Sequence, residues 1–225
     1  MSKLILKVLV GSQAHGLADE NSDHDYRGVF QNPTRESFDV FYKPRNTHWL
    51  EDKSEGKEDN TTWELKYFLE MAVKCNSTIM EVFHAPVIEA NEVGKELLNL
   101  FPKIWNTKDL IRSHLGYATN QRKKFLDNKE LRMNKYAASY IRTLFQCFCF
   151  LENGEYPVDM SPYPIVYSFL KRIREGDYEP GEIIDQAFFY ESVINNTEWK
   201  QKETDIQSVN NFLRKVRIED LRRIV

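Results

Sequence analysis

The sequence predicts a mixed α/β fold in the first third of the chain and a helical region after it. Two apolar runs predict strands: Leu4 to Val10, which ends at a Gly-Ser turn, and Tyr26 to Phe30, which ends before Asn32-Pro33. From about residue 106 onward, apolar residues recur at helical spacing. We therefore expect two domains, residues 1–105 with the sheet and residues 106–225 as a helical domain that forms one wall of a cleft.

Composition limits the classes of protein that the chain can belong to. Its 225 residues are 41% hydrophobic, enough for one core or two modest ones, and its net charge of −3 gives no basic field that would indicate DNA binding. The N-terminal apolar run is too short for a signal peptide, and no run approaches the ~20 residues of a membrane helix. We expect a cytoplasmic protein without a membrane partner, in which Cys75, Cys147 and Cys149 are reduced core thiols.

The stretch at residues 11–28, GSQAHGLADENSDHDYRG, carries the chemistry. Asp23 and Asp25 are spaced i and i+2, which on an extended segment places both carboxylates on one face. Adjacent carboxylates repel each other unless a cation lies between them, and Mg²⁺ or Mn²⁺ takes such oxygen ligands while keeping positions for substrate phosphates. Gly11 and Ser12 offer a phosphate a bare backbone, an N–H and a hydroxyl. Together these features predict phosphoryl or nucleotidyl transfer.

The same stretch resembles a known family. The pattern G-S-x-A-x-G, a short spacer and S-D-x-D is similar to the signature of the DNA polymerase β-like nucleotidyltransferase superfamily. The matching residues are Gly11, Ser12, Ala14, Gly16, Ser22, Asp23 and Asp25. The extension Asp25 to Phe30 resembles the bacterial and phage group of predicted nucleotidyltransferases, the YcgL-like branch, with weaker likeness at 59–83 and 135–155. The resemblance implies a palm with a small mixed sheet, followed by an all-helical C-terminal domain.

The activity that this resemblance implies is two-metal nucleotidyl transfer. An NMP passes from an NTP such as ATP to an acceptor hydroxyl, and pyrophosphate is released. Asp23 and Asp25 are expected to bind both Mg²⁺ or Mn²⁺ ions, and the family places a third carboxylate on a neighbouring strand. Asp59, ahead of a short Thr-Thr-Trp run, is the candidate for this catalytic ligand. Glu58 and Glu64 are its rivals; otherwise Glu58 is a surface charge and Glu64 a helix N-terminal residue.

The resemblance also assigns the phosphate contacts. Gly11 and Ser12 would hold the β- and γ-phosphates, and Arg27 would either neutralise the transferred group or pair with a local acid. The acceptor stays open among RNA, protein and small molecules.

Several basic residues lie between positions 112 and 135. The simplest interpretation is that they form the solvent-exposed face of a helix. Arg122 and Lys135 are candidate contacts for a substrate phosphate. Arg142 lies on the apolar face of a predicted helix, so it needs a carboxylate or phosphate partner if it is buried. It is the third candidate contact.

Local signals place the remaining elements. Asn76 and Thr107 are predicted helix N-caps, and Gly154 is a predicted C-cap. The segment from Asn76 to Phe83 resembles the branch's Asn-Pro-x-x-x-Glu-x-Leu-Phe pattern, with Ser77 in place of the proline. Glu81 is therefore either a functional residue of the family or, as the preferred interpretation, the holder of a buried hydrogen bond or ion pair. His84 is interpreted as structural. The other expected helices cover 64–73, 77–83, 108–120, 136–153, 165–175, 181–195 and 208–221. We expect a strand or a flap at 38–42 and an exposed loop at 45–60.

Three other functions stay open. Transfer to RNA, as in tRNA end modification, is permitted by the basic residues at 112–135 but is not favoured by the net charge. A catalytically silent nucleotide- or protein-binding module, antitoxin-like, would not need Asp23 and Asp25. A metal-dependent phosphohydrolase usually recruits histidine; only His15 and His24 are near, and His24 points away from the aspartates on a regular strand.

Overall fold

The computed structural model describes residues 2–20, 22–42, 46–49, 60–128 and 131–222. Within these residues, five strands form one mixed sheet in the order β3-β4-β2-β1-β5. Strand β1 pairs antiparallel with β2 and β5, β3 pairs antiparallel with β4, and β2 runs parallel to β4. The bounds are β1 Lys3–Val10, β2 Asp25–Gln31, β3 Asn46–Trp49, β4 Asn60–Glu64 and β5 Val87–Ala90. The predicted small mixed sheet is confirmed.

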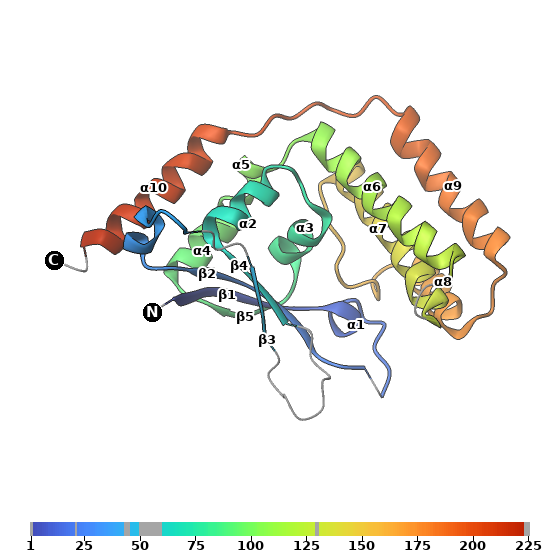
Figure 1. Ribbon diagram of the computed structural model, residues 1–225. Coiled ribbons are helices and arrows are strands. Elements are labelled where there is room, and N and C mark those ends of the chain that lie inside the picture. The colour runs from blue at the N-terminus through green and yellow to red at the C-terminus, as the bar shows by residue number, and fades with distance from the viewer. Residues whose placement is uncertain (1, 21, 43–45, 50–59, 129–130, 223–225) are drawn as a thin grey trace.

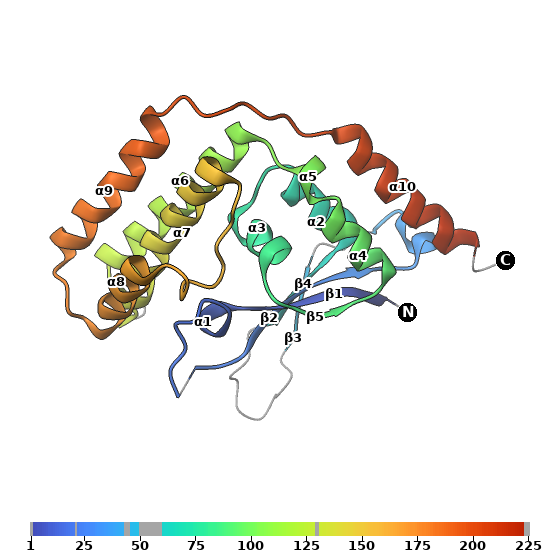
Figure 2. The same ribbon diagram turned by 180° about the vertical axis from the view of Figure 1, so that it is seen from behind.

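Helices alternate with the strands in the first part of the chain and then continue alone after β5. Figures 1 and 2 show α2 to α5 on one face of the sheet, α6 to α9 as a bundle beside it, and α10 at the opposite end. The short helices are α1 Gly11–Ala14, η1 Thr34–Phe38 and α5 Phe101–Ile104. The others are α2 Leu65–Ala72, α3 Ser77–His84, α4 Glu92–Asn99, α6 Thr107–Leu126, α7 Met133–Asn153, α8 Pro164–Glu175, α9 Pro180–Asn196 and α10 Ile206–Arg222. No helix in the described ranges is long and apolar enough to cross a membrane.

Two hydrophobic clusters form the core. The first joins the inner face of the sheet to α2, α3 and α4, with Leu6, Val8, Phe68 and Ile79 fully buried. The second lies among α6 to α9. Leu17, just after the Gly-Ser turn, belongs to the second cluster, so the N-terminal segment takes part in packing the helical bundle. All three cysteines are buried and free, as predicted for core thiols.

The last helix lies with the first cluster rather than with the bundle. Val209, Phe212 and Val216 of α10 belong to this first core cluster. Arg217 of α10 forms an ion pair with Glu64, which is 1% exposed. The predicted domains, 1–105 and 106–225, stay a prediction, but α10 packs against the N-terminal half.

Several local predictions are confirmed. Strand β1 alternates buried and partly exposed residues from Leu6 to Val10, as expected of a strand with one covered face. Asn76 caps α3, because its Oδ1 accepts hydrogen bonds from the backbone N–H groups of Thr78 and Ile79. Gly154 ends α7 in the left-handed conformation.

Other predictions are wrong. Residues 38–42 form no strand, since η1 ends at Phe38 and the Phe38, Val40 and Phe41 side chains are exposed; the alternative, a flap, stays a prediction. The region expected to be loop at 45–60 contains β3. Asn106, not Thr107, caps α6, and the Thr107 hydroxyl instead donates to the Lys200 carbonyl oxygen, a partner far along the chain.

Because His114 of α6 is buried, we expect the stability of the protein to depend on pH. Its Nδ1–H donates to the Leu110 carbonyl oxygen at 2.8 Å, and its Nε2 lies 3.1 Å from the Tyr156 hydroxyl. Burial lowers the pKa of His114 from 6.5 to about 4. Between these pH values the unfolded chain binds a proton that the folded chain does not, so the free energy of unfolding falls as the pH falls. From this group we expect a loss of about 2 kcal/mol between pH 7 and pH 5.

Urea unfolding at the two pH values measures this loss. The variant His114→Gln keeps an acceptor for Tyr156 but has no titratable group, so its decrease should be smaller by about 2 kcal/mol. Equal decreases in the two proteins would contradict the assignment. Burial also lowers the pKa of His15 and His84, so a residual decrease is expected in the variant.

Candidate functional site

The Gly-Ser turn begins where β1 ends. Gly11 has a positive φ of 71°, a conformation that glycine adopts without the steric cost of a Cβ atom. The turn continues as the single-turn helix α1, closed by hydrogen bonds from the His15 N–H to the Gly11 oxygen and from the Leu17 N–H to the Ser12 oxygen, both 3.0 Å. Ser12 is partly buried. The predicted phosphate contacts, Gly11 and Ser12, thus lie together on a well-bonded turn.

Strand pairing brings Asp25 beside this turn. Val10, the last residue of β1, pairs with Asp25, the first residue of β2. A Cβ atom on Gly11 would overlap Oδ2 of Asp25 and lie 3.2 Å from its Cγ. The absence of a side chain at Gly11 therefore leaves the space that the Asp25 carboxylate occupies.

Asp23 has a different setting. It is exposed and precedes β2 by two residues, so its predicted shared face with Asp25 stays a prediction. The loop before it is tied to the turn: the Ser22 hydroxyl and the Asp19 backbone N–H and carboxylate are hydrogen-bonded at 2.9 Å, and Gln13 Nε2 donates to the Ser22 oxygen at 3.2 Å.

The third carboxylate is not settled. Asp59, the predicted ligand, and its rival Glu58 lie outside the described residues. Glu64 lies opposite Phe30 in the β2–β4 ladder, five residues and roughly 16 Å along the strand from Asp25. Its carboxylate accepts the Lys66 N–H as the N-cap of α2 and pairs with Arg217. Glu64 therefore has the helix N-terminal role, not the metal-ligand role.

Sequence reasoning missed Asn60. This residue is fully buried at the start of β4, and its Oδ1 accepts the Tyr26 N–H at 3.0 Å. The bond fixes the backbone immediately after Asp25. Its Nδ2 is buried without a hydrogen-bond partner among the described atoms. The only signal in the sequence was an amide residue at the start of the Thr-Thr-Trp run.

The predicted cationic contacts differ in setting. Arg27 is partly buried on β2, two residues from Asp25 and so on the same face of the sheet, and its NH1 donates to the Tyr26 oxygen at 3.1 Å. Lys135 is exposed on α7. Arg122 is partly buried on α6. Burial raises the pKa of the Tyr140 hydroxyl, and the positive charge of Arg122 opposes that rise. Their contacts with a substrate stay predictions.

Arg142 has a partner on the chain itself. Its side chain is 12% exposed, and NH1 lies 3.6 Å from Oε1 of Glu81, which in turn lies 2.5 Å from Nε2 of His15. The predicted buried ion pair of Glu81 is confirmed. This network of His15, Glu81 and Arg142 begins one residue after α1. The sequence pattern did not reveal it, because its first and last members are 127 positions apart.

The donor set at the turn fits a hard cation. Asp25 provides carboxylate oxygen beside a glycine whose missing Cβ leaves room, and Asp23 provides more at the adjoining loop. Among the described residues, no three His, Cys, Asp or Glu side chains form a ready metal cluster. The predicted third ligand, Asp59, is outside those residues.

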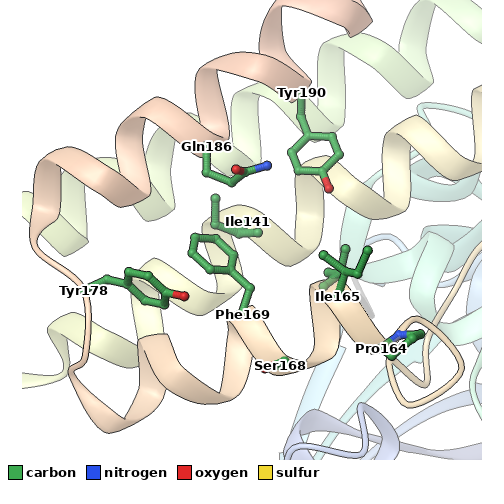
Figure 3. Close-up of a pocket in the computed structure, with 9 residues that line it drawn as sticks. Ile141, Pro164, Ile165, Ser168, Phe169, Tyr178, Gln186 and Tyr190 are labelled. Atoms are coloured by element: carbon green, nitrogen blue, oxygen red, sulfur yellow. The ribbon is translucent and has the colours of Figure 1, made fainter.

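A hollow lies away from the turn, between α7, α8 and α9. It has a volume of about 480 Å³. Figure 3 shows aromatic rings around it together with the amide of Gln186. The residues that line it are Ile141, Pro164, Ile165, Val166, Ser168, Phe169, Tyr178, Gln186 and Tyr190. None belongs to the sheet or to the Gly-Ser turn, and the largely apolar lining does not suit a triphosphate.

Comparison with known proteins identifies the family. A family model described as RlaP, the RNA repair pathway DNA polymerase beta family, matches residues 1–166. The chain belongs to this family. The superfamily indicated by the Gly-Ser and Asp-x-Asp motifs is thereby confirmed.

Two known proteins align with much of the chain. Uncharacterized protein YcgL of Bacillus subtilis (strain 168) is 23% identical over 157 residues, which are 69% of this chain and 59% of YcgL. The match thus spans less than two thirds of YcgL. The crystal structure of a nucleotidyltransferase-like protein from Exiguobacterium sibiricum 255-15 aligns with 96% of this chain and 74% of its own, at 12% identity and a TM-score of 0.33.

The contact between Gly11 and Asp25 gives a test of the site. In Gly11→Ala, the new methyl group must displace the Asp25 carboxylate, so we expect Mn²⁺ affinity to fall by about tenfold or more. The left-handed backbone adds a stability loss of roughly 1 kcal/mol.

Gly154→Ala is the matched control. Gly154 has nearly the same φ, +78°, but a Cβ there would meet nothing within 4 Å. It should lose similar stability and keep its Mn²⁺ affinity. Calorimetry with Mn²⁺ and urea unfolding separate the two effects; unchanged Mn²⁺ binding by Gly11→Ala would refute the role of this contact.

Proposed function

We propose that this chain is a metal-dependent nucleotidyltransferase that moves an NMP from an NTP to an acceptor hydroxyl. The observation that carries the proposal is the placement of the Asp25 carboxylate against the glycine of a Gly-Ser turn, at the paired ends of β1 and β2. Membership of a polymerase β family supports it.

The metal ligands follow from the donor set. Asp23 and Asp25 would hold Mg²⁺ or Mn²⁺, with Asp59 as the proposed third ligand. The bound ions would lower the pKa of the acceptor hydroxyl and stabilise charge on the attacking and leaving oxygens.

The chain's own residues would bind and orient the triphosphate. The N–H groups of the turn and the Ser12 hydroxyl are suited to the β- and γ-phosphates, because Gly11 allows close approach of the backbone. Arg27, on the same face as Asp25, is suited to the charge of the transferred group. With the triphosphate held in line, the acceptor hydroxyl would lose its proton to water and its oxygen would bond to the α-phosphorus. The bond from that phosphorus to the bridging oxygen would break, and pyrophosphate would leave with that oxygen.

RNA is the acceptor class to be tested first. The description of the matched family names an RNA repair pathway, and α6 and α7 carry basic residues. Protein and small-molecule acceptors remain the other arms of the test.

Transfer of label from each α-labelled NTP tests the proposal. The protein is incubated with Mg²⁺ or Mn²⁺ and with total RNA, a protein extract or a small-molecule pool. We expect label to move into one pool, and Asp23→Asn/Asp25→Asn to reduce transfer by more than about a hundredfold, because the ligands themselves are removed.

Asp185→Asn serves as the control, since Asp185 is an exposed aspartate on α9. It should transfer label at the wild-type rate. Absence of transfer by the wild type, together with no metal-dependent NTP binding in calorimetry, would leave a catalytically silent binding module on this fold.

A further inference from the structure

A buried polar network joins three elements next to the Gly-Ser turn. His15 follows α1, Glu81 lies on α3, and Arg142 lies on α7. Glu81 Oε1 is 2.5 Å from His15 Nε2 and 3.6 Å from Arg142 NH1. The three side chains are only 9%, 14% and 12% exposed, respectively. Such a network must satisfy nearly all its members internally, because little water reaches them.

The network extends into the helical half of the chain. Arg142 NH1 also donates to Gln146 Oε1 at 3.2 Å, and Gln146 Nε2 donates to the Pro157 oxygen at 2.9 Å. Because the planar guanidinium group of Arg142 contacts both Glu81 and Gln146, these partners fix its orientation. Glu81 is therefore held by α7 on one side while it holds His15 on the other.

His15 passes this constraint to the turn. Its N–H donates to the Gly11 oxygen, and its own oxygen accepts the Met160 N–H at 3.1 Å. His15 is therefore held by three hydrogen bonds, two from its backbone and one from its imidazole to Glu81. Because it is four residues from Gly11, its position fixes the orientation of α1.

Charge supports the same arrangement. Burial by itself would raise the pKa of Glu81, but neighbouring His15 and Arg142, the hydrogen bond from His15 and the more distant Arg27 lower it to about 2. Burial, and then Arg142, lowers the pKa of His15, with a smaller effect of Arg174 in the same direction. At neutral pH a Glu81 carboxylate therefore pairs with the Arg142 guanidinium and accepts the Nε2–H of a neutral imidazole.

A second buried carboxylate shows what a purely architectural pair looks like. Glu64 is 1% exposed and pairs with Arg217, so it has the same chemistry as Glu81 and Arg142. It ties α10 to the far end of β4, however, about five residues along the ladder from Asp25. Of these two buried pairs, the one of Glu81 is connected to the Gly-Ser turn, through His15.

We propose that Glu81 is a positioning residue of the nucleotide site: through His15 it fixes the turn at residues 11–14, and through its ion pair with Arg142 it ties that turn to α7. The inference rests on the proposed function, since it assigns the turn to the triphosphate. Glu81 itself touches no substrate. Its loss should weaken triphosphate binding rather than remove a reacting group.

Glu81→Gln and Glu64→Gln form a matched pair for the test, because each removes one buried carboxylate charge without changing the side-chain length. The probe is the α,β-methylene analogue of ATP with Mg²⁺, and calorimetry gives its affinity. We expect Glu81→Gln to bind the analogue roughly ten- to a hundredfold more weakly than the wild type. Glu64→Gln should bind it as the wild type does, with a comparable loss of stability in urea.

Nitrogen NMR of the imidazoles gives a readout that does not depend on substrate. In the wild type, His15 should be the neutral form with its proton on Nε2, and Glu81→Gln should shift this signal while Glu64→Gln leaves it in place. A wild-type His15 protonated on Nδ1 alone would overturn the geometry on which the inference rests.

The outcomes separate this inference from the proposed function. Wild-type binding of the analogue with equal binding by Glu81→Gln, or with equal weakening by Glu64→Gln, overturns the positioning role and leaves the proposed function standing. Failure of the wild type to bind the analogue overturns the proposed function, and the positioning role falls with it whatever His15 shows.

Discussion

The antiparallel pairing of β1 with β2 is the constraint on which the rest of the site depends. It places the last residue of one strand, Val10, against the first of the next, Asp25. The residue after Val10 must then adopt a left-handed backbone conformation with no room for a Cβ atom beside the Asp25 carboxylate. Glycine adopts this conformation without steric cost. Gly11 meets both demands. The register of the two strands alone thus brings the Asp25 side chain next to the Gly11 backbone, without any contribution from the helices.

The helices then hold that arrangement with buried charges. Glu64 and Glu81 are acidic residues with little exposed side chain, and each is paired with an arginine distant in sequence, Arg217 and Arg142. Burying ion pairs gives little net stability compared with apolar packing, but it penalises any arrangement in which one partner is missing. These pairs therefore select one docking geometry for α10 and for α7, while the two apolar clusters supply most of the favourable free energy.

Most of what was predictable from the sequence is local. The turn at Gly11, the Asn76 cap and the glycine at the end of α7 follow from the conformations that these residues favour. Features that depend on remote partners were not predictable: the strand β3, the cap role of Asn106 rather than Thr107, and the position of α10 on the N-terminal core. Arg142 illustrates the limit, because its need for a partner is evident in the sequence, whereas Glu81 as that partner is decided only by packing.

The segment after the turn makes the site and the bundle interdependent. His15 accepts a backbone hydrogen bond from Met160, and Arg174 of α8 donates to the Leu17 oxygen, while the Leu17 side chain packs among α6 to α9. A shift of the bundle would therefore move residues 15–17 and, through the hydrogen bonds of α1, the Gly-Ser turn. The stretch that matches the family model, residues 1–166, contains the whole path from Gly11 through Glu81 and Arg142 to Met160. Most of α8, including Arg174, and the helices α9 and α10 lie outside that stretch.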